Sequence, residues 1–321
     1  MKKLINLAVV SFSALIFASA SLAQSGKPIT LIVPFAPGAS ADGIARIVGR
    51  ELSQALGQPV VVDNKAGAGG ALGLMAVAKS PADGLTIGLG ATGAIAVNPH
   101  LPDAAPLQPQ KDLMPLAKLA DIPLVFVTST VSGYGNLQAF LKAARNTPSG
   151  LSYATSGQYT SQHLSGELLA SLSGVTLVPI PYKGSGPAVT DLLGGIVPAA
   201  MVDLTSAYPH VKAGKLVVLG LTSAKRSKVA PELPTLAEEG VDGYAAPAWM
   251  GLFLPTKTPL DVRNRLSNAL QKVMANPNVQ SQIQALAAEP AYLEPKAFGD
   301  FIDAESKKWG TVVSQIQKTA K

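Results

Sequence analysis

Apolar and polar positions alternate in two different patterns along the chain. Short runs rich in Val, Ile and Leu, such as ITLIVPF at 29–35 and PVVVDN at 59–64, predict strands. Between them, residues 42–57 place apolar side chains at helical spacing and end at Gly57, which predicts a helix. This order of short strands and amphipathic helices is typical of α/β proteins with crossover helices.

The pattern changes near residue 107 and then resumes. Residues 107–129 combine proline breaks with a strand that is predicted to cross to a second lobe. A second α/β series follows, and the chain ends in two amphipathic helical stretches at 260–276 and 298–321. The sequence therefore predicts two α/β segments with a helical tail and no internal repeat.

The first 23 residues have the features of a secretory signal peptide. Lys2 and Lys3 precede a nearly uncharged apolar run, and SLA at 21–23 fits a small-x-small cleavage site. A transmembrane anchor is the alternative, but the run is short and no stop-transfer cluster follows it. We predict cleavage, a mature chain that begins near Gln24, and a periplasmic location.

Composition narrows the classes of function. The sequence has no cysteine, which excludes disulfides and thiolate metal sites. Removing Lys2 and Lys3 lowers the formal net charge from +6 to +4, and the remaining basic residues are scattered. This distribution gives no support to a nucleic-acid partner and suits an anionic small ligand better.

Loops between strands and helices are the candidate binding segments. The loop PFAPGASAD at 34–42 leads from a strand to a helix N-terminus, where free backbone N–H groups and the helix dipole stabilise an anion. Gly38 and Ala39 are small enough for a ligand to approach the backbone. Ser40 or Asp42 can alternatively serve only as the N-cap of the helix.

A second loop, at 64–73, contains Gly67, Gly69 and Gly73 and has some likeness to a dinucleotide phosphate loop. It follows the second strand, however, and no acidic residue stands about 20 positions further on to hold a ribose. We therefore interpret these glycines as positions of close helix–strand packing.

Three later loops carry polar side chains at strand ends. The stretch at 153–169 is dense in hydroxyl groups, which suit a carboxylate, although turn and cap chemistry is an equal alternative. Lys183 is expected near an anion. Asp203 ends a strand and is either part of a site or a solvated cap. His163, inside a helix, is interpreted as a packed or supporting group.

The sequence contains no known catalytic motif. It has neither G-x-S-x-G nor H-E-x-x-H, and only three histidines. We predict no catalytic residue, no metal site and no cofactor. The alternative that remains is an exported α/β hydrolase in which His163 works with a neighbouring hydroxyl.

Taken together, these motifs resemble the tripartite tricarboxylate transporter substrate-binding receptors, also called the Bug or TctC-like family. The resemblance extends over almost the whole mature chain. It rests on the segments PITLIVPFAPGASAD, LGQPVVVDNKAGAGG, PADGLTI, YATSG, TSQHLSGELL, VPIPYKGSGPAVTDLLGG, KLVVLGLTSAKRS and PTLAEEGVDGY. One departure is Ala39, which stands where the family usually has a second glycine and leaves the loop conformation open.

The resemblance implies a type II periplasmic-binding-protein fold, with two α/β lobes that are joined by crossing strands and close on a ligand. It assigns residues 24–125 and 247–321 to lobe 1 and residues 126–246 to lobe 2. It also implies a small carboxylate ligand, the membrane components of a tripartite tricarboxylate-type transporter as partners, and a monomer.

The family's binding residues can be carried over to matching positions. The resemblance implies that one carboxylate is held mainly by backbone N–H groups and ordered water at the first strand–helix loop. The implied binding residues are Phe35, Ala36, Pro37 and Gly38, with Ser40 and Asp42 shaping the loop; Thr155, Ser156, Gly157, Thr160 and Ser161 on the facing lobe; Lys183 and Asp203 nearby; and Thr92 at the rim.

Overall fold

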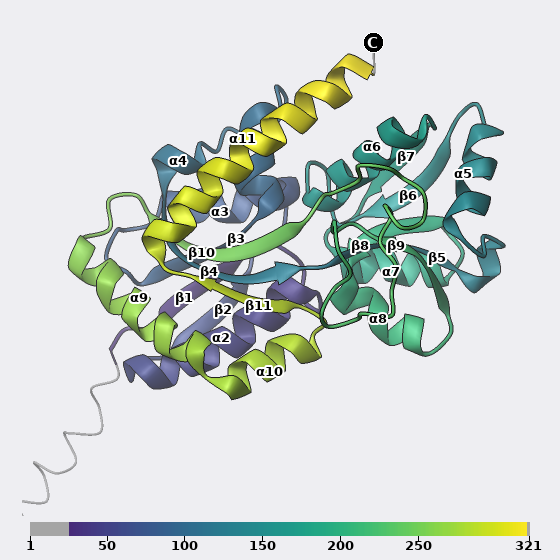
Figure 1. Ribbon diagram of the computed structural model, residues 1–321. Coiled ribbons are helices and arrows are strands. Elements are labelled where there is room, and N and C mark those ends of the chain that lie inside the picture. The colour runs from purple at the N-terminus through teal and green to yellow at the C-terminus, as the bar shows by residue number, and fades with distance from the viewer. Residues whose placement is uncertain (1–25, 320–321) are drawn as a thin grey trace, which may run out of the picture.

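The computed structural model describes residues 26–319, so the signal peptide predicted at 1–23 lies outside the described residues. These residues form two α/β lobes that lie side by side, each built around its own sheet (Figure 1). The fold prediction is confirmed in its main feature, two lobes connected by crossing strands. Within residues 26–319, no helix combines the length and apolar character that a membrane span requires.

The first lobe contains a six-stranded sheet with the order β11-β4-β10-β3-β1-β2. β1 pairs in parallel with β2 and β3, whereas β10 runs antiparallel to β3 and β4. The strands are β1 (Ile29–Val33), β2 (Val60–Asn64), β3 (Thr86–Ala91), β4 (Leu113–Ile122), β10 (Ala248–Pro255) and β11 (Glu289–Leu293). The helices are α2 (Ser40–Leu56), α3 (Ala71–Ala78), α4 (Pro109–Asp112), α9 (Leu260–Ala275), α10 (Pro277–Ala285) and α11 (Pro295–Thr319), with short helices η1 (Ala68–Gly70), η2 (Gly93–Val97) and η3 (Asn98–His100).

The second lobe contains a five-stranded sheet with the order β7-β6-β8-β5-β9. β6 is parallel to β7 and β8, and β5 is antiparallel to β8 and β9. The strands are β5 (Leu124–Ser129), β6 (Leu151–Thr155), β7 (Leu177–Pro181), β8 (Ala199–Asp203) and β9 (Leu216–Leu221). The helices are η4 (Thr130–Ser132), α5 (Leu137–Arg145), α6 (Ser161–Ser173), α7 (Ser185–Leu193) and α8 (Leu204–Lys212).

The chain passes between the sheets twice. β4 belongs to the first sheet and β5 to the second, and only Pro123 separates them. The return runs through residues 222–247 into β10. We propose the lobe boundaries at these two crossings, near the predicted positions at 125/126 and 246/247. The sequence pattern did not predict β10, α10 or β11.

The helix predicted after β1 is present as α2, and the apolar positions of its sequence pattern are buried. Ile44, Val48 and Leu52 of α2 are fully buried, as their helical spacing predicts. Burying each such side chain stabilises the folded protein by about 1.5–3 kcal/mol compared with leaving it exposed to water. Gly57 ends the helix with φ 62°, a left-handed conformation that glycine adopts without strain.

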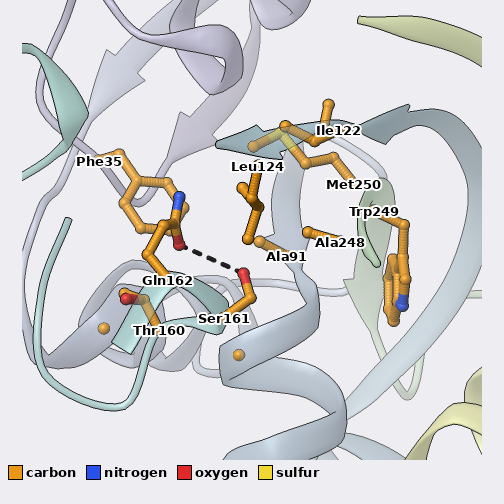
Figure 2. A pocket seen from close by; sticks show the side chains of 12 residues that line it. Phe35, Ala91, Ile122, Leu124, Thr160, Ser161, Gln162, Ala248, Trp249 and Met250 are labelled. Carbon is orange, nitrogen blue, oxygen red and sulfur yellow. Dashed lines mark hydrogen bonds between the residues drawn. The ribbon is translucent and has the colours of Figure 1, made fainter. Parts of the chain in front are cut away.

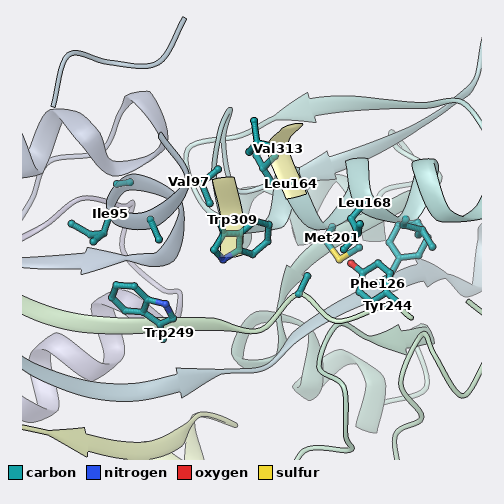
Figure 3. Packing of buried hydrophobic residues seen from close by; sticks show 14 of the residues in the cluster. Ile95, Val97, Phe126, Leu164, Leu168, Met201, Tyr244, Trp249, Trp309 and Val313 are labelled. Carbon is teal, nitrogen blue, oxygen red and sulfur yellow. The ribbon is translucent and has the colours of Figure 1, made fainter. Parts of the chain in front are cut away.

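One apolar cluster extends across both lobes. Helix α11 packs against η2 of the first lobe and also reaches α6 of the second lobe (Figures 1 and 3). Its Trp309, which is 1% exposed, lies between Val97 on one side and Leu164 on the other (Figure 3). The two lobes are therefore in direct apolar contact through α11, which touches η2 of the first lobe and α6 of the second.

Candidate functional site

Two adjoining hollows lie between the lobes. The larger comprises about 310 Å³ of empty space and the smaller about 230 Å³, open solvent included, and the cavity volume proper is about 20 Å³ in each. Both are lined by Phe35, Gln162 and Met250. Figure 2 shows the side chains around the larger hollow. Its remaining lining residues are Gly69, Ala91, Gly93, Ile122, Leu124, Thr160, Ser161, Ala248 and Trp249. The smaller hollow is completed by Ala39, Ser40, Ala41, Ser156, Gly184, Ser185 and Asp203.

The two hollows together are called the interlobe cavity, and three helices begin at it. α2 starts at Ser40, α6 at Ser161 and α7 at Ser185, and each of these residues lines one of the hollows. Within residues 26–319, the backbone N–H groups of Ser40 and Ala41 have no hydrogen-bond acceptor. Free N–H groups and converging helix dipoles make this region favourable for an anion.

The first strand–helix loop has a defined conformation despite Ala39. Gly38 takes the left-handed conformation with φ +95°, whereas Ala39 is extended with φ −104° and so does not need to be glycine. Ala39 is the N-cap residue, so the alternative that Ser40 or Asp42 is the N-cap is wrong. Pro37 and Gly38 are exposed and line neither hollow.

Asp42 and Asn64 brace this loop from behind. The Asp42 carboxylate accepts hydrogen bonds from Gly38 N (3.4 Å), Arg46 Nε (2.9 Å) and Asn64 Nδ2 (3.1 Å). Asn64 also donates to the carbonyl of Phe35 at 3.0 Å. Burial by itself raises the pKa of Asp42, but the hydrogen bonds and the Arg46 charge outweigh burial and hold that pKa below its ordinary value.

This network predicts an acid-sensitive contribution to stability. Because the pKa of Asp42 is lowered in the folded protein, the ionised carboxylate adds to the free energy of unfolding. This stabilisation is complete above the ordinary pKa of 3.8 and is lost as the pH falls through the lower pKa of the folded protein. We expect Asp42→Asn to lower the melting temperature at neutral pH. The difference between the two proteins should shrink as the pH drops below 3.8, because wild-type Asp42 also becomes neutral. Melting curves of both proteins across pH 2–7 test this, and a constant difference would contradict it.

Gly38 offers a test of the loop itself. A left-handed conformation costs a side-chain-bearing residue about 1–2 kcal/mol, although a Cβ at Gly38 meets nothing within 4 Å. We expect Gly38→Val to move the loop and to weaken ligand binding about tenfold, with a melting temperature that falls by only a few degrees. Gly133→Val is the matched control, since Gly133 is also left-handed (φ +81°) with open space around it, and it lines neither hollow. Equal affinity losses in both variants would contradict a specific role of this loop.

In the second lobe, most hydroxyls of the loop after β6 are used internally. Thr155 exchanges hydrogen bonds with Gly157, and Thr160 Oγ1 donates to the Gly157 carbonyl at 2.7 Å and caps α6. Ser156 differs, because its Oγ is buried and has no hydrogen-bond partner among the described residues. Since Ser156 lines the smaller hollow, its unpartnered hydroxyl is a candidate donor to a ligand there.

Gln162 is a cavity residue that sequence reasoning missed. It lines both hollows, and its Oε1 accepts a hydrogen bond from Ser161 Oγ at 3.3 Å (Figure 2). Its side-chain nitrogen remains available for a ligand acceptor. The available signal was its position in the first turn of α6, directly after the predicted Ser161.

His163 lies behind the cavity and lines neither hollow. Its Nδ1 accepts a hydrogen bond from the backbone N–H of Tyr159 at 2.9 Å. Tyr159 has φ +61°, a strained conformation for a residue with a side chain. The imidazole thus stabilises the turn that leads into Thr160 and Ser161.

Asp203 and Ser40 connect the lobes across the smaller hollow. Ser40 Oγ donates to Asp203 Oδ2 at 3.0 Å, while Asp203 Oδ1 accepts from Ser206 N at 2.9 Å and caps α8. Asp203 is 3% exposed, so it is a buried cap and not the solvated one that was the alternative. A second link between the lobes is the bond from Ala36 N to the Lys183 carbonyl, at 3.1 Å.

Lys183 and Thr92 occupy the edges of the site. The exposed Lys183 side chain lines a third and larger hollow between the lobes, together with Gly67, Gly70 and Gly157. This hollow shares Phe35, Gly69 and Ser156 with the other two and is called the cavity mouth. Thr92 is fully buried, and its hydroxyl exchanges hydrogen bonds with the backbone of Trp249, accepting from N at 2.8 Å. It therefore fixes β10 beside the cavity, and its hydroxyl is already occupied.

Glycines allow the lobes to approach closely at the cavity edge. A Cβ on Gly93 would lie 2.8 Å from Thr160 Cα, and one on Gly69 would lie 2.4 Å from the Gln158 carbonyl oxygen. Both contacts join the first lobe to the second. At Gly73 a Cβ would lie 2.8 Å from Pro34 Cβ, which agrees with the prediction of close helix–strand packing there.

Comparison with known proteins places this architecture in a family. Residues 44–318 match the family model described as "Tripartite tricarboxylate transporter family receptor". Protein BugT of Bordetella pertussis is 37% identical over 290 residues, which cover 90% of this chain and 89% of BugT.

Solved structures agree with the sequence comparison. The periplasmic binding protein BugD is 30% identical, with a TM-score of 0.85 and coverage of 91% of this chain and 98% of BugD. The structure "R. palustris Rpa4515 with adipate" is also 30% identical, with a TM-score of 0.86 and coverage of 92% and 98%. The chain therefore belongs to the receptor family of the tripartite tricarboxylate transporters.

Proposed function

We propose that this protein is an exported solute receptor that closes its two lobes on a small carboxylate and delivers it to the membrane components of a tripartite tricarboxylate-type transporter. The observation that carries the proposal is the meeting of the N-termini of α2, α6 and α7 at a buried interlobe cavity. Membership of the receptor family supports the transport role, and the adipate complex of a relative supports a carboxylate ligand.

Closure follows from contacts made by both lobes. A ligand that touches α2 of the first lobe and α6 or α7 of the second stabilises the closed state by the contacts it makes only there. The hydrogen bonds from Ser40 to Asp203 and from Ala36 to Lys183 also join the two lobes, so they stabilise the same closed state. Ligand release to a transporter then requires these links to break.

The residues proposed for binding divide into direct and supporting groups. Direct contacts are assigned to the N–H groups of Ser40 and Ala41, the Ser156 hydroxyl and the Gln162 amide, and the Ser161 hydroxyl orients that amide by donating to Gln162 Oε1. The supporting group keeps these in place and consists of Phe35, Ala36, Pro37, Gly38, Asp42, Thr92, Thr155, Gly157, Thr160, His163, Lys183 and Asp203.

We further propose a periplasmic location and a monomeric state. The description of BugD as a periplasmic binding protein and the signal-like residues 1–23 support the location.

The enzyme alternative has no structural support. His163 uses Nδ1 for the Tyr159 N–H and lines neither hollow, so it is not placed to act on a bound molecule. The family model that the chain matches describes a transporter receptor, and the similar structure BugD is a periplasmic binding protein.

A thermal-shift screen of the exported protein against mono-, di- and tricarboxylates tests the proposal. A ligand at about 100 times its dissociation constant stabilises by roughly 2.7 kcal/mol, which raises the melting temperature by several degrees. The responding acid should be recovered unchanged after long incubation. Conversion of the acid into a product, or stabilisation only by uncharged or cationic compounds, would contradict the proposal.

A further inference from the structure

The backbone is strained where α10 ends. Leu286 and Ala287 follow this helix, and Ala287 has φ +54°, a left-handed conformation that costs free energy for any residue with a side chain. The Ala287 N–H donates to the Gln284 carbonyl at 2.8 Å, and the next N–H donates to the Ile283 carbonyl at 3.3 Å. Helix ends with this pattern usually have glycine at the left-handed position. The methyl group of Ala287 therefore needs a reason that outweighs the strain.

Leu286 and Ala287 pack into different lobes. Leu286 packs against the apolar cluster of the first lobe. Ala287 is 5% exposed and belongs to the apolar cluster of the second lobe, in which every other buried member lies between Val125 and Leu233. The Ala287 methyl group thus adds apolar contact between the lobes, and a glycine would remove this contact. The strained backbone is offset by a contact with the opposite lobe.

Hydrogen bonds join the same segment to the second lobe. The Thr205 hydroxyl of α8 donates to the Leu286 carbonyl. Glu289 Oε1 accepts hydrogen bonds from Ser227 Oγ at 2.6 Å and from Lys228 N at 3.0 Å, and both donors belong to the return segment that leads into β10. Residues 286–289, called the interlobe seam, therefore contact the second lobe through one buried methyl group and three hydrogen bonds.

The interlobe seam contacts the two helices that carry the hydrogen bond between Ser40 and Asp203. α10 packs beside α2 and ends toward α8 (Figure 1). A Cβ on Gly43, in the first turn of α2, would lie 2.7 Å from Leu286 Cδ1, so Leu286 packs directly on α2. Thr205 follows Asp203 by two residues in the first turn of α8. The seam thus joins α2 to α8 outside the cavity, whereas Ser40 joins them at the smaller hollow.

We propose that the interlobe seam is a latch that stabilises the closed state of the receptor, and that Ala287 and Thr205 set its strength. Residues 286–289 line none of the three hollows, so the two are positioning residues, which act on ligand affinity through the approach of α8 to α2. Contacts that are complete only in the closed state favour the state that holds the ligand. This inference rests on the proposed function, closure of the lobes on a carboxylate, and extends it to contacts outside the cavity.

Ala287→Gly distinguishes a latch from a purely structural contact by the signs of two effects. Glycine relieves the left-handed strain, so the melting temperature of the ligand-free, open protein should stay the same or rise. It also removes the methyl group from the closed state, so the dissociation constant should rise about threefold to tenfold. Isothermal titration uses the strongest binder among acetate, succinate, adipate, citrate and benzoate.

Two results would overturn the latch. The first is a dissociation constant of Ala287→Gly that equals or falls below that of wild type. The second is a lower melting temperature of the ligand-free variant, because the methyl contact would then exist in both states. If none of the five acids binds to the wild-type protein, the proposed function fails and the inference fails with it.

Thr205→Val and Thr205→Ser are a matched pair for the polar contact. Valine keeps the shape of threonine and deletes the donor to the Leu286 carbonyl, whereas serine keeps the hydroxyl. With the same acid, stopped-flow kinetics should show that Thr205→Val raises the dissociation rate about threefold to tenfold with little change in the association rate. Thr205→Ser should restore a rate within about twofold of wild type. A wild-type dissociation rate in Thr205→Val, or equal increases in both variants, would overturn the role of this hydrogen bond and leave the proposed function intact.

Discussion

Gly93→Ala is expected to weaken ligand binding by about tenfold to a hundredfold and to leave the folding of each lobe intact. The added Cβ would lie 2.8 Å from both Thr160 Cα and the Tyr159 carbonyl oxygen, which belong to the opposite lobe. Overpacking of a tight contact costs about 1–3 kcal/mol, and opening of the lobes relieves this cost. The substitution therefore penalises the closed state, on which binding depends.

Isothermal titration with the responding acid measures this effect, and a melting curve of the ligand-free protein monitors folding. Gly299→Ala on α11 is the matched control, because a Cβ there meets nothing within 4 Å. Wild-type affinity in the Gly93→Ala protein would mean that the bound state does not bring these two segments together.

Asp203→Ala is expected to lower both stability and affinity. It removes the cap of α8, which costs about 1 kcal/mol, and it takes away the acceptor of the Ser40 hydroxyl. A hydrogen bond to a charged group contributes about 1.5–3 kcal/mol, and this one forms only when the lobes meet. Affinity should therefore fall about tenfold or more.

Ser40→Ala separates the two effects of Asp203. It deletes the bond between the lobes and leaves the Asp203 cap on α8 in place. We expect an affinity loss close to that of Asp203→Ala, with a much smaller fall in the melting temperature of the ligand-free protein. If Ser40→Ala binds like wild type, the bond between Ser40 and Asp203 does not contribute to closure.

The segments that border the cavity were predictable because strand–helix loops have a distinctive composition. The loop at 34–42 and the hydroxyl-rich stretch after β6 combine small or polar residues with a following helix, and both reach the cavity. Asp203 was found for the same reason, since it ends a strand and begins a helix.

The apolar part of the cavity was not predictable from the pattern. Ile122, Leu124 and Met250 occur in runs that look like those of any buried strand. Periodicity indicates that a side chain is buried but not whether protein or ligand covers it. Only the crossing of β4–β5 beside β10 makes them a common floor.

The detailed roles of predicted polar residues also depend on tertiary contacts. Thr92 and Ser156 are both hydroxyl residues that follow strands, yet the first is occupied by the Trp249 backbone and the second is free. Likewise, only the backbone angles show that Gly38, and not Ala39, takes the positive φ in the first loop.

The most direct test of the central claim is a crystal structure of the exported protein with the acid that responds in the thermal screen. The account predicts one carboxylate between the lobes, within hydrogen-bond distance of the Ser40 or Ala41 N–H and of the Ser156 hydroxyl. A bound acid at the cavity mouth beside Lys183, or anywhere outside the two hollows, would contradict it.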